Sequence, residues 1–136
     1  MDKLEYIEGD VVMYDNKIMV IKEPRDGSHF DLSCPKEGLA YCFIGVDEIK
    51  PVSLTSAILE KNGWEKYRSN IVFKDRGLGW IAYRHPNYPF TLRYDNILGM
   101  CDVSFNDGKD NFFSIESVHQ LQHLLFGLNI NHEMEV

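Results

Sequence analysis

The amino-acid sequence predicts an α+β fold in which antiparallel strands make up most of the chain. Short runs of β-branched and aromatic residues recur along the 136 residues, separated by Gly, Pro, Asn and Asp, as is typical of strands joined by tight turns. Only residues 54–63 and 114–128 change to the apolar spacing of helices. We therefore expect a small SH3-like β-barrel or curled sheet over 1–53, followed by a helix, an antiparallel meander and a C-terminal helix over 54–136. The two segments could also form one continuous domain, 1–136.

The N-terminal segment begins with a predicted hairpin. Two β-rich runs, Val11–Tyr14 and Ile18–Lys22, flank Asp15-Asn16-Lys17, and Asn tolerates the left-handed backbone of a tight turn. Residues 24–28 contain Pro, Asp and Gly and are expected to end the second strand. Further strands are predicted at residues 29–34, 39–46 and 49–52, with a turn at 35–38.

The second segment opens with a helix of about two turns at residues 54–63. Thr55 is the expected N-cap, and Gly63 lies where a left-handed residue ends a helix. Strands are predicted next at 65–68, 71–74, 78–84, 90–94 and 97–105, with turns at 75–77, 85–89, 95–96 and 106–109. A meander of this kind buries one face and exposes the other.

The C-terminal helix, residues 114–128, has the most regular pattern in the chain. Ser117 and Gln120 have the spacing of a capping box. One face carries the apolar residues Val118, Leu121, Leu124, Leu125 and Leu128. We expect this face to cover the apolar face of the meander, and residues 129–136 to add an edge strand or to fray.

Composition narrows the possible partners. The net charge is −7, and residues 1–50 carry 6 basic against 11 acidic groups. An acidic chain repels phosphate at long range, so nucleic acid is a disfavoured partner. No apolar run is long enough to span a membrane, and the first ten residues lack the pattern of a secretory signal. Together with three irregularly spaced cysteines, this predicts a cytoplasmic protein with no membrane partner.

Two stretches resemble a known set of proteins. IKPVSLTSAILEKNGW (49–64) and VHQLQHLLFGLNINHEMEV (118–136) are similar to sequences of uncharacterised proteins from Bacteroides-type gut bacteria and their phages or mobile elements. The resemblance implies a helix entry after an N-terminal β segment and a closing Val-His-Gln-Leu-Gln helix. It implies no catalytic or ligand residues. Similar tails usually have Asn where this chain has His123.

Histidines on the last helix are weak metal candidates. His119 and His123 are four residues apart, so they point the same way, and His132 follows the helix. Two ligands do not complete a zinc site, and no Glu adjoins His119 to act as a base. We expect His119 to make a hydrogen bond at the flank of the apolar face, and His123→Asn to be nearly silent.

The cysteines give weaker signals. If strands pair across residues 35–38, Cys34 and Cys42 could approach each other near His29 and bind a metal or form a disulfide, but seven intervening residues are a weak signal for either. Cys101 has no histidine close in sequence to activate it. Buried, unreactive thiols are therefore expected, with no cofactor.

The stretch WIAYRHPNYPFTLRY (80–94) mixes aromatic and basic residues. Strand alternation places Trp80 and Ala82 on one side and Ile81 and Tyr83 on the other. Rings on one side can be core, while basic residues line an aromatic edge. The candidate binding residues are Tyr83, Arg84, His85, Arg93 and Tyr94.

A non-enzymatic protein-interaction module is the favoured hypothesis, with another protein or a second copy as partner and a setting related to phages or mobile elements. An accessory protein for nucleic acid, using Tyr83, Arg84, Arg93 and Tyr94, is one alternative. A small metal-dependent enzyme using His119, His123 and either His132 or Cys101 is the other.

Overall fold

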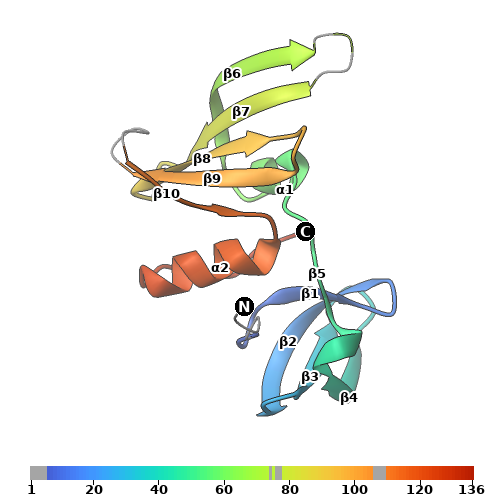
Figure 1. Cartoon of the computed structure of the whole chain (residues 1–136). Helices are drawn as coiled ribbons and strands as arrows, with labels where there is room; N and C mark the ends of the chain where they lie inside the picture. Colours follow the sequence, from blue (N-terminus) through green and yellow to red (C-terminus); the bar gives the residue numbers. More distant parts are fainter. Residues whose placement is uncertain (1–5, 74, 76–77, 106–109) are drawn as a thin grey trace. The chain divides into compact units, whose positions relative to one another are not determined.

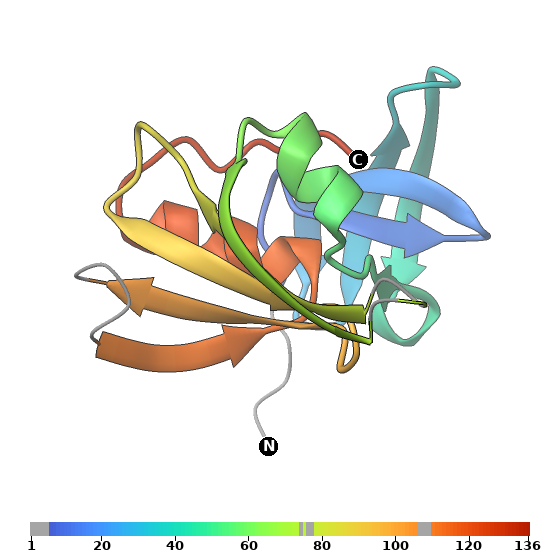
Figure 2. The ribbon, with the colours of Figure 1, turned by 90° about the horizontal axis from the view of Figure 1, so that it is seen from above.

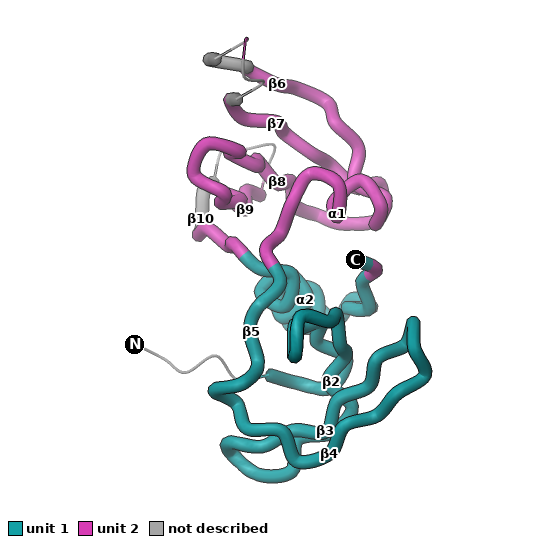
Figure 3. Tube along the Cα trace, turned by 90° about the vertical axis from the view of Figure 1, so that its right-hand side faces the viewer, with its two compact units in different colours: residues 1–52, 117–134, 136 teal, residues 53–116, 135 magenta. Residues whose placement is uncertain are grey.

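A computed structural model describes residues 6–73, 75, 78–105 and 110–136. The chain forms two compact units (Figure 3). Unit 1 comprises residues 1–52, 117–134 and 136, and unit 2 comprises residues 53–116 and 135. Each unit contains one five-stranded antiparallel sheet, so the predicted α+β class is confirmed.

The sheet of unit 1 has the strand order β4-β3-β2-β1-β5 (Figure 1). Its strands are β1 (Val11–Tyr14), β2 (Lys17–Asp26), β3 (His29–Cys34), β4 (Leu39–Gly45) and β5 (Lys50–Pro51), with the 3-10 turn η1 (Val46–Glu48) before β5. Among the described residues no pairing joins the two outer strands, β4 and β5, so the sheet is not a closed barrel.

Local turn chemistry explains the first hairpin. Asp15 and Asn16 have φ values of 51° and 59°, the left-handed pair that a two-residue hairpin turn requires, and the predicted hairpin is confirmed. The predicted break at residue 24 is wrong. β2 continues to Asp26 because Pro24 lies between two register shifts, where the sheet tolerates a missing N–H donor.

The core of unit 1 follows strand alternation. Phe30, Leu32 and Cys34 are buried on β3, while the residues between them are more exposed. They join a cluster of buried side chains from β1, β2 and the segments around them, namely Tyr6, Val12, Met19, Ile21 and Ile49.

Unit 2 begins with helix α1 (Ser56–Lys61). Thr55 caps it, because its Oγ1 accepts a hydrogen bond from Ile58 N at 3.3 Å, and Gly63 beyond its end has φ +88°. Strands β6 (Glu65–Phe73), β7 (Leu78–Arg84), β8 (Phe90–Asp95), β9 (Met100–Phe105) and β10 (Asp110–Ile115) form a meander in the order β10-β9-β8-β7-β6 (Figure 2).

Several predicted boundaries in unit 2 differ from the structure. The strands predicted at 65–68 and 71–74 are one strand, β6, with two register shifts. The loop predicted at 95–96 is longer, because Gly99 takes φ +71° and its N–H donates to the Asp95 carbonyl at 2.8 Å. Most of the turn predicted at 75–77, and all of that at 106–109, lie outside the described residues.

Helix α2 (Val118–Gly127) is shorter than predicted, because Ser114 and Ile115 belong to β10. Ser117 and Gln120 form the predicted capping box, with Ser117 N donating to Gln120 Oε1 at 3.1 Å. Residues 131–136 form neither helix nor strand, and no helix of the described residues is long and apolar enough to cross a membrane.

Helix α2 is grouped with the N-terminal sheet in unit 1, whereas strands β6 to β10 form unit 2. Side-chain hydrogen bonds attach it near β1: Gln122 Oε1 accepts from Val11 N at 2.7 Å, and Gln122 Nε2 donates to Gly9 O at 2.8 Å. Val118, Leu121 and Leu125 on the apolar face of α2 are buried, as the sequence pattern predicted.

Candidate binding site

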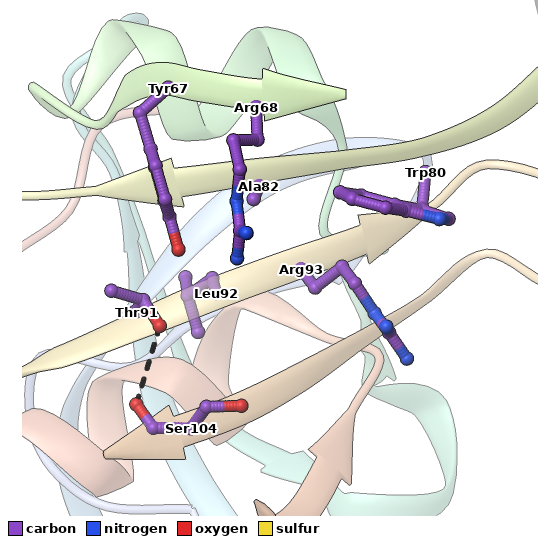
Figure 4. Close-up of a pocket in the computed structure, with 8 residues that line it drawn as sticks. All are labelled: Tyr67, Arg68, Trp80, Ala82, Thr91, Leu92, Arg93 and Ser104. Atoms are coloured by element: carbon purple, nitrogen blue, oxygen red, sulfur yellow. Dashed lines mark hydrogen bonds between the residues drawn. The ribbon is translucent and has the colours of Figure 1, made fainter. Parts of the chain in front are cut away.

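A pocket of about 230 Å³ opens on one face of the unit 2 sheet (Figure 4). The side chains around it come from four adjacent strands, β6 to β9. They are Tyr67, Arg68, Trp80, Ala82, Thr91, Leu92, Arg93 and Ser104. Together they combine aromatic walls, guanidinium groups and hydroxyl groups in a single depression.

A β-bulge in β6 delivers two neighbouring side chains to this pocket. Successive residues of a regular strand point to opposite faces. The register of β6 against β7 shifts between Lys66 and Arg68, so the strand carries one extra residue there. As a result Tyr67 and Arg68 both point from β6 toward the middle of the sheet (Figure 4).

A small residue forms the pocket floor. Ala82 pairs with Arg68 on one side and with Arg93 on the other, so its methyl group lies between two long side chains. It is 4% exposed. Neighbouring strands are about 4.8 Å apart, so the two arginines begin about 10 Å from each other across this gap. Trp80, two residues along β7, closes one end (Figure 4).

One of the guanidinium groups at the pocket, that of Arg93, is paired with a carboxylate. Arg93 Nη2 lies 3.0 Å from Asp102 Oδ2, and its guanidinium lies 5.5 Å from the centre of the Trp80 ring. Asp102 Oδ1 also accepts a hydrogen bond from Ser114 Oγ at 2.6 Å.

Two further guanidinium groups lie over one ring. Arg68 and Arg84 are 5.4 and 5.7 Å from the centre of Tyr67. In the part of the chain that the structure describes, neither forms an ion pair with a carboxylate. Two guanidinium groups near one ring, without a carboxylate partner among the described residues, make this a favourable place for an anionic ligand.

The structure separates the five predicted binding residues. Arg93 lines the pocket, and Arg84 lies beside it over Tyr67. Tyr83 is 0% exposed on the opposite face, and its Oη donates to Glu60 Oε2 at 2.9 Å. Burial, chiefly, raises the pKa of Tyr83 to about 12. This tyrosine is therefore a core residue.

The other two predicted residues also lie elsewhere. Tyr94 pairs with Ile81 and Cys101 on the face opposite the pocket, and burial raises its pKa. His85 stacks on Tyr88 with ring centres 3.9 Å apart, and lies 5.4 Å from the ring centre of Trp64. It belongs to an aromatic cluster that packs the end of β7.

Sequence reasoning missed Tyr67 and Arg68 as site residues. Strand alternation placed Trp80 and Ala82 on one face, and Arg93 was predicted as a residue at the rim of an aromatic edge. The bulge carries no sequence signal comparable to a Gly or Pro turn, and a regular β6 would put Tyr67 and Arg68 on opposite faces.

The histidines of the metal hypothesis lie in unit 1 and serve its structure. His123 Nε2 lies 2.7 Å from Oδ2 of Asp10, a carboxylate with 0% exposure that also accepts from Ile7 N at 2.9 Å. His132 Nε2 is 3.1 Å from the carbonyl of Glu8. Within the described residues no group of three or more His, Cys, Asp or Glu side chains is placed to hold a metal ion.

His119 on α2 is fully buried. Its Nδ1 is 3.1 Å from Ser117 Oγ, and its ring centre lies 5.0 Å from that of Tyr6. Burial lowers the pKa of His119, the Asp10 carboxylate opposes this, and His123 adds a smaller lowering effect. Its Nε2 and Asp10 Oδ1 are buried without a hydrogen-bond partner among the described residues.

All three cysteines are free thiols, and only Cys42 is exposed. Cys34 pairs with Leu39 rather than approaching Cys42, because the β3–β4 register places Tyr41 opposite Leu32. Burial raises the pKa of Cys101 to about 12, which disfavours the thiolate that a nucleophile requires. Cys101 also belongs to unit 2, whereas the three candidate histidines belong to unit 1.

Comparison of the chain with protein-family models, with curated proteins and with solved structures gives no match.

Proposed function

We propose that this protein is a non-enzymatic interaction module that binds an acidic segment of a protein through the pocket of unit 2. The observation that carries the proposal is the pair Arg68 and Arg84, held over Tyr67 without a carboxylate partner among the described residues. An acidic side chain satisfies these guanidinium groups, and an adjacent apolar side chain fills the space over Ala82.

Charge distribution supports a local anionic ligand despite the acidic chain. Residues 53–116 carry eight basic and eight acidic side chains, so the surplus of negative charge lies outside the segment that forms the pocket. An acidic peptide is therefore not repelled by this segment as a whole, and the arginines attract it locally.

The strand arrangement of unit 1 supports the proposal that the protein is an interaction module. In this unit the strand order β4-β3-β2-β1-β5, with a 3-10 turn before the last strand, is compatible with a partly open SH3-like barrel, and we assign unit 1 to that architecture as part of the proposal. Such barrels serve many functions, so the fold alone does not name a ligand. The proposed setting in phages or mobile elements rests on the sequence resemblance of residues 49–64 and 118–136.

Single-stranded nucleic acid is the competing ligand, because rings and arginines on an open sheet face can stack bases and contact phosphates. The hydroxyl groups and small apolar floor of the pocket suit one peptide side chain better than a row of bases. The experiment below compares the two ligands directly.

The test uses the full chain and two fluorescein-labelled probes, the peptide Gly-Glu-Asp-Phe-Asp-Glu-Gly and a twelve-residue oligothymidylate. Fluorescence anisotropy at about 50 and about 300 mM salt measures binding, and weakening at higher salt is expected for an anionic peptide. Arg68→Glu and Ala82→Leu are each expected to weaken peptide binding at least about tenfold, which corresponds to about 1.4 kcal/mol. Lys22→Glu, an exposed charge reversal in unit 1, is the matched control and is expected to bind normally.

The proposal is overturned if the wild type does not bind the peptide, or if Arg68→Glu binds it as well as Lys22→Glu does. Salt-dependent binding of the oligothymidylate that is lost in Arg68→Glu, without peptide binding, would establish the nucleic-acid alternative.

A further inference from the structure

Unit 1 carries an exposed aromatic side chain in an unfavourable backbone conformation. Phe43 on β4 is 58% exposed and has φ +57°, a left-handed value that is rare for a bulky residue. Strain of this kind persists only where surrounding contacts impose it, and it is common at functional surfaces.

The surrounding contacts hold this ring in one place. Phe43 N donates to Asp31 Oδ1 at 2.9 Å, and Arg25 fixes Asp31 through contacts of 2.7 Å from Nε and Nη2 to Oδ2. The ring stacks on His29, with centres 4.0 Å apart and an interplanar angle of 7°. Phe43 is thus a rigid apolar knob, which loses little conformational entropy on binding.

Carboxylates gather at the same end of the sheet. His29 Nδ1 lies 3.0 Å from Asp26 Oδ1, and His29 pairs with Gly45. The space beside the Gly45 Cα is occupied by the carboxylates of Asp47 and Glu48. The knob therefore projects from a surface on which Asp26, Asp47 and Glu48 supply negative charge, with Arg25 already paired to Asp31.

This surface complements the pocket of unit 2. A cavity of about 150 Å³ holds a benzene molecule, so the pocket of about 230 Å³ is large enough for a phenyl ring. Tyr67 and Trp80 offer ring contacts, while Arg68 and Arg84 offer positive charge to the carboxylates around the knob.

We propose that the acidic segment bound by the pocket is the Phe43 knob of a second copy of this chain. The inference rests on the proposed function and names its partner. The contact is heterologous, since the knob of one copy enters the pocket of the next, so it forms rings or open chains rather than a two-fold pair. One knob in one pocket buries a small area, so the association is weak.

Sedimentation velocity from about 10 μM to about 1 mM tests the inference, a range suited to small transient interfaces. The weight-average sedimentation coefficient of the wild type is expected to rise with concentration. Phe43→Asn removes the ring while favouring its backbone conformation, and is expected to remain folded and monomeric. Ala82→Leu fills the pocket and is also expected to be monomeric, with Arg68→Glu as a second pocket variant should the first fail to fold.

Mixing the two variants gives the decisive measurement. Phe43→Asn retains a pocket and Ala82→Leu retains a knob, so an equimolar mixture forms one intact contact per pair. We expect heterodimers and no larger species. A monomeric wild type across the whole range, or association that persists in Phe43→Asn, overturns the inference.

Peptide binding distinguishes a failure of the self-association inference from a failure of the proposed function. Phe43→Asn keeps its pocket and is expected to bind the acidic peptide at least as well as the wild type. If the wild type is monomeric but binds the peptide through Arg68, only the self-association is wrong. If it neither associates nor binds the peptide, both proposals fail.

Discussion

His123 Nε2 lies 2.7 Å from Oδ2 of Asp10, and so joins helix α2 to a carboxylate that has no exposed surface. The two residues are 113 positions apart in the chain. A buried carboxylate is stable only when its oxygens are hydrogen-bonded or paired with positive charge. This contact therefore ties the two ends of unit 1 together.

Replacing His123 by Asn is expected to destabilise unit 1, in contrast to the nearly silent effect expected from sequence. The shorter side chain does not span the distance to Asp10, which retains one hydrogen bond, from Ile7 N. We expect a loss of about 1 to 3 kcal/mol, measured by urea denaturation. Lys22→Glu, a change of an exposed residue in unit 1, is the control. A stability of His123→Asn equal to that of this control would show that Asp10 does not depend on His123.

The free energy of unfolding is expected to decline as the pH falls below about 6.5, the ordinary histidine value. Burial lowers the pKa of His119 in the folded state, so the unfolded chain binds a proton first and is favoured. The hydrogen bond from Arg25 lowers the pKa of Asp31 below its ordinary value of 3.8. The stabilisation that this contact gives the folded state is therefore lost only at pH values well below those at which His119 titrates. Denaturation at pH 7.5 and 5.0 measures the decline, and His119→Gln is expected to reduce it. An unchanged pH dependence in that variant would contradict the assignment to His119.

Tyr83 is expected to behave as a core residue. Tyr83→Ala leaves a cavity where a fully buried ring was, and we expect a loss of about 3 to 5 kcal/mol in the stability of unit 2. Tyr83→Phe removes the hydroxyl group and its hydrogen bonds with Glu60 and Ser56, with an expected loss of about 1 kcal/mol. Thermal and urea unfolding compare the two. If Tyr83→Ala folds with normal stability, Tyr83 is not a core residue and is again a candidate for the binding surface.

Two leucines of α2 distinguish the buried face from the exposed one. Leu121 is 0% exposed and Leu128 is 37% exposed, so Leu128 is not part of the buried face that the sequence pattern predicted. Leu121→Asp places a charge in an apolar interior and is expected to destabilise the fold severely, whereas Leu128→Asp is expected to change stability by less than about 0.5 kcal/mol. Circular dichroism with urea titration measures both. Similar stabilities would refute the assignment of faces.

Most residues of the candidate site were not predicted from the sequence, and strand β6 shows why. Strand alternation correctly placed Trp80 and Ala82 on one face and Tyr83 on the other, and Arg93 was identified as a rim residue. The contribution of β6 depends on one inserted residue between Lys66 and Arg68, which exchanges the faces of the residues beyond it. That insertion is set by pairing with β7, so it is not visible in a single strand.

The sequence by itself determined the features that depend on a few neighbouring residues. The left-handed Asp15-Asn16 turn, the Thr55 cap and the Ser117–Gln120 capping box follow from side chains within four positions of the backbone groups that they satisfy. Tertiary structure alone decided where β6 bulges, how Ala82 comes to lie between Arg68 and Arg93, and which polar side chains join α2 to the N-terminal segment. These features depend on pairing and contacts between residues far apart in the chain, such as His123 and Asp10, which no short stretch of sequence specifies.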